Sequence, residues 1–232
     1  MANTRKKVFI TGGSRGIGLA IARQFHQHGY HVIIGGRNQA RLEAAAAELP
    51  GLETYACDLA EAAEVDQLIA WLHQTHAPLD VLVNNAGIFR PGSLLEESGE
   101  ALQAMMRVNF ESVFQLTQGL LPAMVARKQG SIINIGSIAG KKAYASSSAY
   151  SISKFALQGY TENLRQELMP HGIRVLNVLP GATWTDSWAG ADLPEDRLMP
   201  AEDIGRIVYE AYALSERTVI EEVVARPQLG DL

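Results

Sequence analysis

The feature of this sequence that most constrains its fold is an alternation of short apolar runs with longer segments of helical periodicity. Runs such as VFIT (8–11) and HVIIGG (31–36) are continuously apolar and end in glycine or polar residues, which is typical of strands buried in a parallel sheet. The predicted strands are 8–11, 31–36, 80–87, 131–137 and 174–181, and the predicted helices are 16–29, 38–49, 61–76, 98–127, 149–171 and 201–215. This alternation predicts an α/β protein with a doubly wound, mostly parallel sheet and helices on both faces.

The chain shows no linker, repeat or low-complexity segment, so residues 1–232 are predicted to form one domain. A net charge of −5 argues against nucleic acid as a partner. The single cysteine excludes an internal disulfide framework and fits a reducing compartment. The first apolar run is too short for a signal-peptide core, and no later run approaches a membrane span. We therefore expect a soluble, cytoplasmic protein without a membrane partner.

The first predicted strand leads directly into the glycine-rich segment TGGSRGIG, Thr11–Gly18. Its glycines allow a tight turn and bring backbone N–H groups close to a ligand, while the following helix directs its positive end at a phosphate. The spacing is G-x-x-x-G-x-G rather than the G-x-G-x-x-G of many dinucleotide folds. A glycine turn without a ligand is the alternative, but the position between a strand and a helix favours a dinucleotide site.

A second motif is SSSAYSISK, Ser146–Lys154. Residues four apart share a helix face, so Tyr150 and Lys154 are predicted neighbours. A free tyrosine titrates near pH ~10, and lowering its pKa by about three units requires roughly 4 kcal/mol. One ammonium at about 4 Å and an effective dielectric near 20 supplies an energy of that order. The alternative for the pair alone is a solvated helix face.

Taken together, these motifs resemble the short-chain dehydrogenase/reductase family, in its single-domain branch with T-G-x-x-x-G-x-G and Y-x-x-x-K. The resemblance covers nearly the whole chain in the family's order: Thr11–Gly18, Asp58, "NNAG" at 84–87, Asn109, Ser137, Tyr150, Lys154, Pro180–Gly181 and Thr185. It implies a Rossmann fold with a cofactor-binding half at about 1–90 and a catalytic and substrate-binding half at about 91–232. It also implies hydride transfer between a nicotinamide cofactor and a carbonyl or alcohol.

The resemblance assigns the catalytic residues Asn109, Ser137, Tyr150 and Lys154. The family's serine lies thirteen residues before the tyrosine, which selects Ser137 and leaves 146–148 as caps or loop residues. Tyr150 is the expected proton donor or acceptor, and Ser137 the donor to the same substrate oxygen. Asn109 has two interpretations: a core amide bonded to neighbouring backbone, or support for a water that relays protons to Lys154.

The expected cofactor is NADP(H) rather than NAD(H). NAD-selecting members of dinucleotide folds place an acid after the second strand, where this chain has Gly36 followed by Arg37. Arg15 is expected to approach the same 2′-phosphate, and Asp58 the adenine; solvated surface arginines are the alternative. The predicted cofactor-binding residues are Thr11, Gly12, Ser14, Arg15, Gly16, Ile17, Gly18, Arg37, Asp58, Leu59, Asn85, Ala86, Gly87, Tyr150, Lys154, Pro180, Gly181, Thr183 and Thr185.

Substrate identity is less constrained. The predicted substrate-contacting residues are Ser137, Tyr144, Tyr150, Trp184 and Trp188, with Ile138 and Phe89 nearby. The tryptophans indicate either a flat or apolar substrate or a lid packed shut, within a compact segment 182–199. The favoured function is an NADPH-dependent carbonyl or 3-oxoacyl reductase. The alternatives are a sepiapterin-type reductase, which the tail RPQLGDL also resembles, and a non-catalytic NADP-sensing regulator.

Two further expectations concern assembly and metals. The resemblance implies a homodimer or homotetramer, and apolar residues at Phe110, Phe114, Phe155 and Leu157 are candidates for the interface. No metal site is expected: His26, His28 and His31 lack carboxylate or cysteine neighbours in sequence, and His73 and His76 are predicted to interact with the negative end of their helix. Cys57, in the strand before Asp58, is expected to be a small buried thiol.

Overall fold

The computed structural model describes residues 5–145, 147–188 and 193–231. Its centre is a seven-stranded, fully parallel sheet in the order β3-β2-β1-β4-β5-β6-β7. The strands are β1 (Lys7–Thr11), β2 (His31–Gly36), β3 (Glu53–Ala56), β4 (Val81–Asn84), β5 (Gly130–Ile135), β6 (Ile173–Pro180) and β7 (Glu222–Ala225). The predicted parallel α/β architecture is confirmed, while β3 and β7 were not among the five predicted strand ranges.

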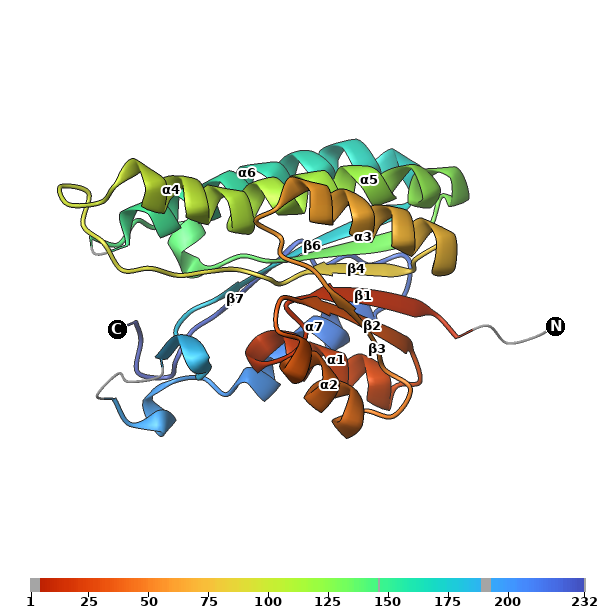
Figure 1. The fold of residues 1–232 in the computed structure, drawn as a ribbon, viewed down its shortest axis with the longest axis horizontal. Helices are drawn as coiled ribbons and strands as arrows, with labels where there is room; N and C mark the ends of the chain where they lie inside the picture. The colour runs from red at the N-terminus through yellow and green to blue at the C-terminus, as the bar shows by residue number, and fades with distance from the viewer. Residues whose placement is uncertain (1–4, 146, 189–192, 232) are drawn as a thin grey trace.

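Helices cover both faces of the sheet (Figure 1). In that view α3 to α6 lie above the sheet, and α1, α2 and α7 lie below it. The helices are α1 (Gly16–Gln27), α2 (Gln39–Glu48), α3 (Ala62–Thr75), α4 (Gly99–Met106), α5 (Ser112–Arg127), α6 (Ser148–Leu168) and α7 (Ala201–Tyr212). No helix in the described ranges has the length and apolar character needed to cross a membrane.

The sheet separates two apolar cores, because successive side chains of a strand point to opposite faces. Within β1, Ile10 packs into the core shared with α1, α2 and α7, whereas Phe9 packs into the core shared with α3, α5 and α6. Both side chains are fully buried. The continuously apolar strands of the sequence are therefore explained by burial on both faces of a parallel sheet.

The predicted helix 98–127 is divided in the structure. A π-helical segment, Arg107–Glu111, lies between α4 and α5 and contains Asn109. Such segments are rare and occur frequently at functional sites.

The chain order reverses at β1, which pairs with β2 on one side and β4 on the other. Ligands of open α/β sheets bind outside the carboxyl ends of the strands at such a reversal. The segments that follow β1 and β4 therefore form the walls of the expected site.

Candidate active site

The loop after β1 has the backbone that a close-approaching ligand requires. Gly12 adopts a φ of +64°, and a Cβ at Gly18 would lie 2.2 Å from the carbonyl oxygen of Gly12. Only glycine permits this approach of α1 to the loop. The N-cap residue Arg15 makes no side-chain hydrogen bond to the first N–H groups of α1. These groups lie at the positively polarised end of the helix. The arrangement suits an anionic phosphate.

Thr11 and Asn85 join this loop to the segment after β4. The Thr11 hydroxyl accepts hydrogen bonds from the backbone N–H groups of Asn85 and Ala86, each at 3.0 Å. The Asn85 amide donates to the carbonyl oxygens of Thr11 and Gly12, at 2.9 and 3.2 Å. Thr11 is buried and does not line the hollows described next.

Two adjoining hollows form a continuous groove across these segments. The first is lined by most of the predicted cofactor-binding residues: Gly12, Ser14, Arg15, Gly16, Ile17, Gly18, Arg37, Asp58, Leu59, Asn85, Ala86, Gly87 and Thr185. The second contains the others except Thr11, namely Tyr150, Lys154, Pro180, Gly181 and Thr183, together with Ser137. The hollows share Ile17, Asn85, Gly87, Ile88 and Thr185 as a common wall.

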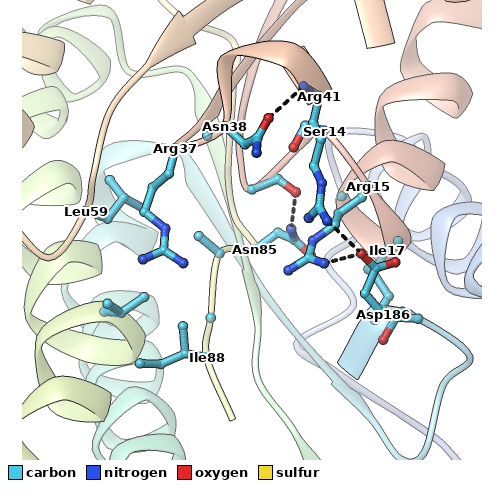
Figure 2. Close-up of a pocket in the computed structure, with 18 of the residues that line it drawn as sticks. Ser14, Arg15, Ile17, Arg37, Asn38, Arg41, Leu59, Asn85, Ile88 and Asp186 are labelled. Atoms are coloured by element: carbon cyan, nitrogen blue, oxygen red, sulfur yellow. Dashed lines mark hydrogen bonds and ion pairs between the residues drawn. The ribbon is translucent and has the colours of Figure 1, made fainter. Parts of the chain in front are cut away.

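Three arginines line the first hollow, and each is held by a carboxylate. Figure 2 shows Arg15 and Arg41 converging on Asp186, with Arg37 on the opposite side. Arg37 Nη1 lies 3.6 Å from Asp58 Oδ2. The hydrogen bond from Arg15 lowers the pKa of Asp186. Sequence reasoning identified Arg15 and Arg37 but missed Arg41 and Asp186.

The position of Arg41 follows from a local sequence signal. Asn38 is the N-cap of α2, and its side-chain oxygen accepts a hydrogen bond from the Arg41 N–H at 3.0 Å. This cap fixes the start of the helix directly after the turn that contains Arg37. The sequence could have indicated Arg41, because Asn38 is a helix cap directly after the second strand and the arginine follows three residues later.

Tyr150 and Lys154 share a face of α6 and both line the second hollow, as their spacing predicts. Lys154 is 4% exposed, and its Nζ donates to the carbonyl oxygen of Ile135 at 3.0 Å. Ser137 follows the end of β5 and lines the same hollow. Its Oγ accepts a hydrogen bond from Ala139 N at 3.1 Å, which orients the side chain.

The electrostatics of the pair differ from the sequence-based expectation. Burial raises the pKa of Tyr150, and a hydrogen bond with Ser137 opposes this shift in part. Burial also lowers the pKa of Lys154, to about 8. The described residues therefore do not lower the pKa of the phenol as expected, because desolvation disfavours the charged forms of both groups.

The start of α6 is capped by an acid rather than by one of the neighbouring serines. Ser147 is the N-cap residue without a side-chain capping bond, and Ser148 is the first helical residue; Ser146 lies outside the described residues. Glu97 instead caps this helix, since its carboxylate accepts a hydrogen bond from Ala149 N at 2.7 Å. Glu97 thereby fixes the turn that carries Tyr150, a contact that the sequence did not reveal.

Asn109 is completely buried and makes three hydrogen bonds. Its Oδ1 accepts from Ile88 N at 2.8 Å, and its Nδ2 donates to Ile88 O at 3.0 Å and to Ser153 Oγ at 2.9 Å. These contacts join the π-helical segment, the segment after β4, and α6. They correspond to the first interpretation of Asn109, a core amide bonded to neighbouring backbone.

The outer part of the second hollow combines aromatic and acidic groups. Phe89 packs edge-on against Tyr150 with ring centroids 5.1 Å apart. The Tyr144 hydroxyl donates to Asp231 Oδ2 at 2.7 Å, and both residues line the hollow. Trp188 and Ile138 also line it, whereas Trp184 does not. Asp231 was not predicted, because only the tail after β7 brings it here; residues 189–192 of the predicted lid 182–199 lie outside the described ranges.

Cys57 is buried and lines the first hollow. Burial raises its pKa to about 12, and the neighbouring acids Glu64 and Asp58 add to the shift. A thiol held protonated in this way is a poor nucleophile, which confirms the expectation of a small buried side chain.

Comparison with known proteins shows the family. Residues 6–195 match the model of the short chain dehydrogenase family. The sepiapterin reductase of Chlorobaculum tepidum is 34% identical, with 97% of each chain covered. A metagenomic short-chain oxidoreductase solved with NADP is 33% identical, with 96% and 97% coverage and a TM-score of 0.83. The closed form of a serine dehydrogenase complexed with NADP⁺ is 30% identical, with 94% coverage of each chain and a TM-score of 0.87.

The matched family, the fold and the order of the motifs agree over nearly the whole chain. This protein belongs to the short-chain dehydrogenase/reductase family.

Proposed function

We propose that this protein is an NADPH-dependent reductase of small carbonyl compounds. The observation that carries this proposal is the continuity of the groove: Ser137, Tyr150 and Lys154 line one hollow, which shares a wall with the hollow of the glycine loop. A cofactor spanning both would place its reactive end beside the proton donor. The NADP found with structural neighbours supports the same cofactor here.

The residues present fit NADP(H). The glycine loop and the N-terminus of α1 suit the pyrophosphate. Arg15, Arg37 and Arg41 line the same hollow and can give a 2′-phosphate charge-assisted hydrogen bonds once their carboxylate partners are displaced. No acid stands at position 36 to bond an adenosine ribose. When bound, the reduced nicotinamide supplies the hydride.

In the proposed reaction, Tyr150 donates its proton to the carbonyl oxygen of the substrate, and Ser137 donates a hydrogen bond to the same oxygen. The raised pKa of Tyr150 keeps the phenol protonated, which is the form that reduction requires. Lys154 stabilises the phenolate that the proton transfer leaves behind. Asn109 holds the Ile88 backbone in the wall of both hollows, and through Ser153 it also contacts α6.

A second candidate is reduction of a pterin side chain. The full-length similarity to a sepiapterin reductase supports it. So does the acidic group in the outer part of the hollow, because Asp231 can accept a hydrogen bond from an amino group of a flat heterocycle. Arg226 lowers the pKa of Asp231 and keeps it ionised. Phe89 and Trp188 offer aromatic surfaces to such a ring system.

NADPH oxidation measured against ketones, diketones, 3-oxoacyl thioesters and pterins tests the proposal. Turnover of simple ketones or diketones supports a general carbonyl reductase, and strong preference for a pterin supports the second candidate. Tight NADPH binding without turnover of any of these compounds would instead favour a non-catalytic sensor.

We also propose that the chain acts as one domain within a cytoplasmic homodimer or homotetramer. The free, buried Cys57 is consistent with a reducing compartment. Phe114 on α5, and Phe155 and Ile152 on α6, are each nearly half exposed, and we take them as the candidate apolar surface. Leu157 is buried and therefore does not belong to this apolar surface.

A further inference from the structure

Away from the groove, three potential metal ligands converge at the opposite end of the sheet. His31 is the first residue of β2, Glu53 is the first residue of β3, and His76 ends α3. The amino ends of neighbouring parallel strands meet at one edge, which brings these distant positions together. Sequence reasoning considered His31 only with its chain neighbours His26 and His28 and found no carboxylate beside it.

The imidazoles of His31 and His76 both contact the carboxylate of Glu53. His31 Nε2 lies 2.8 Å from Glu53 Oε1, and His76 Nε2 lies 3.2 Å from Glu53 Oε2. The two rings are stacked, with centroids 5.6 Å apart and an interplanar angle of 28°. One ligand atom from each of the three residues falls within 4.8 Å of the others.

His76 provides the second, independent observation. The residue is only 5% exposed, and its Nε2 has no hydrogen-bond partner in the described part of the chain, since the contact with Glu53 lacks hydrogen-bond geometry. A buried polar atom of this kind is explained by a partner from outside the chain, either a water molecule or an ion.

We propose that His31, Glu53 and His76 bind a divalent transition-metal ion, for which Zn²⁺ is the best match. Two imidazoles and one carboxylate form a ligand set typical of zinc with an open fourth position. Zinc bonds of about 2.0–2.2 Å place tetrahedral ligand atoms roughly 3.3 Å apart. The two His–Glu separations of 2.8 and 3.2 Å are close to this spacing, and the remaining ligand atoms lie within 4.8 Å, so side-chain rotation must bring them closer.

The surroundings are consistent with a small, partly hydrated site. Glu53 is partly exposed, so water can complete the coordination. Trp71 packs against His76 with ring centroids 4.6 Å apart and limits its movement. A neighbouring cation, Lys7, donates a hydrogen bond to the His76 carbonyl oxygen at 3.0 Å, and its charge reduces the affinity of the site for a metal ion. The metal would join β2, β3 and the end of α3 without contacting the groove.

The test is titration of chelator-treated protein with Zn²⁺ by calorimetry, and with Co²⁺ by visible absorption. We expect one equivalent to bind, a tetrahedral Co²⁺ spectrum, and a rise in melting temperature with Zn²⁺. Glu53→Gln should reduce the affinity at least about 100-fold, since even changes to outer-shell partners cost about 10–100-fold. His73→Gln is the matched control, because this helix-end histidine contacts Gly119 O instead of the cluster.

A second readout requires no substitution. Zn²⁺ should shift the imidazole ¹⁵N resonances of His31 and His76 in the unaltered protein and leave that of His73 in place. Weak binding that Glu53→Gln does not change, or ¹⁵N shifts spread over all histidines, would overturn the site and leave a simple ion pair. The measurements do not involve NADPH turnover, so their result is independent of the proposed function.

Discussion

The Lys154 ammonium lies 5.7 Å from the centroid of the Tyr150 ring. Within the described residues, Lys154 Nζ donates a hydrogen bond to Ile135 O rather than to the phenol of Tyr150. The lysine therefore influences Tyr150 through space, from a buried position that disfavours its own charge. Catalysis and stability make opposite demands on this residue.

Replacing Lys154 by methionine should stabilise the protein and remove its activity. The native pKa of Lys154 is lowered from 10.5 to about 8, so the unfolded chain binds more protons between these values and stability rises with pH through that window. At neutral pH the buried charge of Lys154 costs about 3 kcal/mol of folding stability. Lys154→Met removes this cost but leaves the Ile135 carbonyl without its donor, so we expect a net gain of about 1–3 kcal/mol.

Urea unfolding at pH 7 and at pH 10 checks this prediction. The wild type should gain stability between the two pH values relative to Lys154→Met, whose own profile should lack this rise. If the stability of the wild type and of Lys154→Met changed equally between the two pH values, the charge of Lys154 would not destabilise the folded protein.

Cofactor selection should depend on the arginines of the first hollow. Arg15→Ala and Arg41→Ala should each weaken NADPH binding about ten- to a hundred-fold, the equivalent of roughly 1.5–3 kcal/mol, and change NADH binding little. Arg23→Ala is the control, since this α1 arginine pairs with Glu48 outside the groove. Fluorescence titration with both cofactors gives the comparison.

An acid at position 36 should reverse the preference. A Cβ at Gly36 would meet Ser14 Oγ at 3.4 Å and Leu42 Cδ2 at 3.5 Å, which are ordinary contacts, so Gly36→Asp fits the backbone. Combined with Arg37→Ala, it should weaken NADPH strongly and spare or improve NADH. Equal use of both cofactors by the unaltered protein would contradict phosphate recognition here.

Asn109→Ala should destabilise the protein by about 1–3 kcal/mol, because the backbone N–H and C=O of Ile88 both lose their partner. Thermal unfolding measures this loss. If Asn109 also supports a proton relay, the kcat of the folded variant should fall at saturating NADPH. An unchanged kcat would restrict Asn109 to its structural contacts.

The apolar surface on α5 and α6 predicts self-association. Sedimentation of the wild type at micromolar concentration should show a dimer or tetramer, and Phe114→Glu with Phe155→Glu should yield monomer. Leu95→Glu is the control, being 96% exposed and outside this surface. A wild type that sediments only as monomer contradicts the assembly.

The sequence was sufficient where function depends on local patterns. The parallel strands, the glycine loop, and the shared helix face of Tyr150 and Lys154 all follow from spacing of a few residues. The contacts of Asp186 with Arg15, and of Asp231 with Tyr144, join positions far apart in the chain and have no local signature. The short, half-exposed strand β7 lacks the apolar run of a central strand. Burial, which decides the pKa values of Tyr150 and Lys154, is likewise a property of the folded chain.

The most direct test of the proposed mechanism is the single-turnover rate of NADPH oxidation by Tyr150→Phe, with a ketone that the wild type reduces. Phenylalanine keeps the ring packed against Phe89 but removes the proton donor. We predict a rate at least about 100-fold lower, with NADPH affinity nearly unchanged. Carbonyl reduction by Tyr150→Phe at a rate close to that of the wild type would contradict the assignment of Tyr150 as the acid.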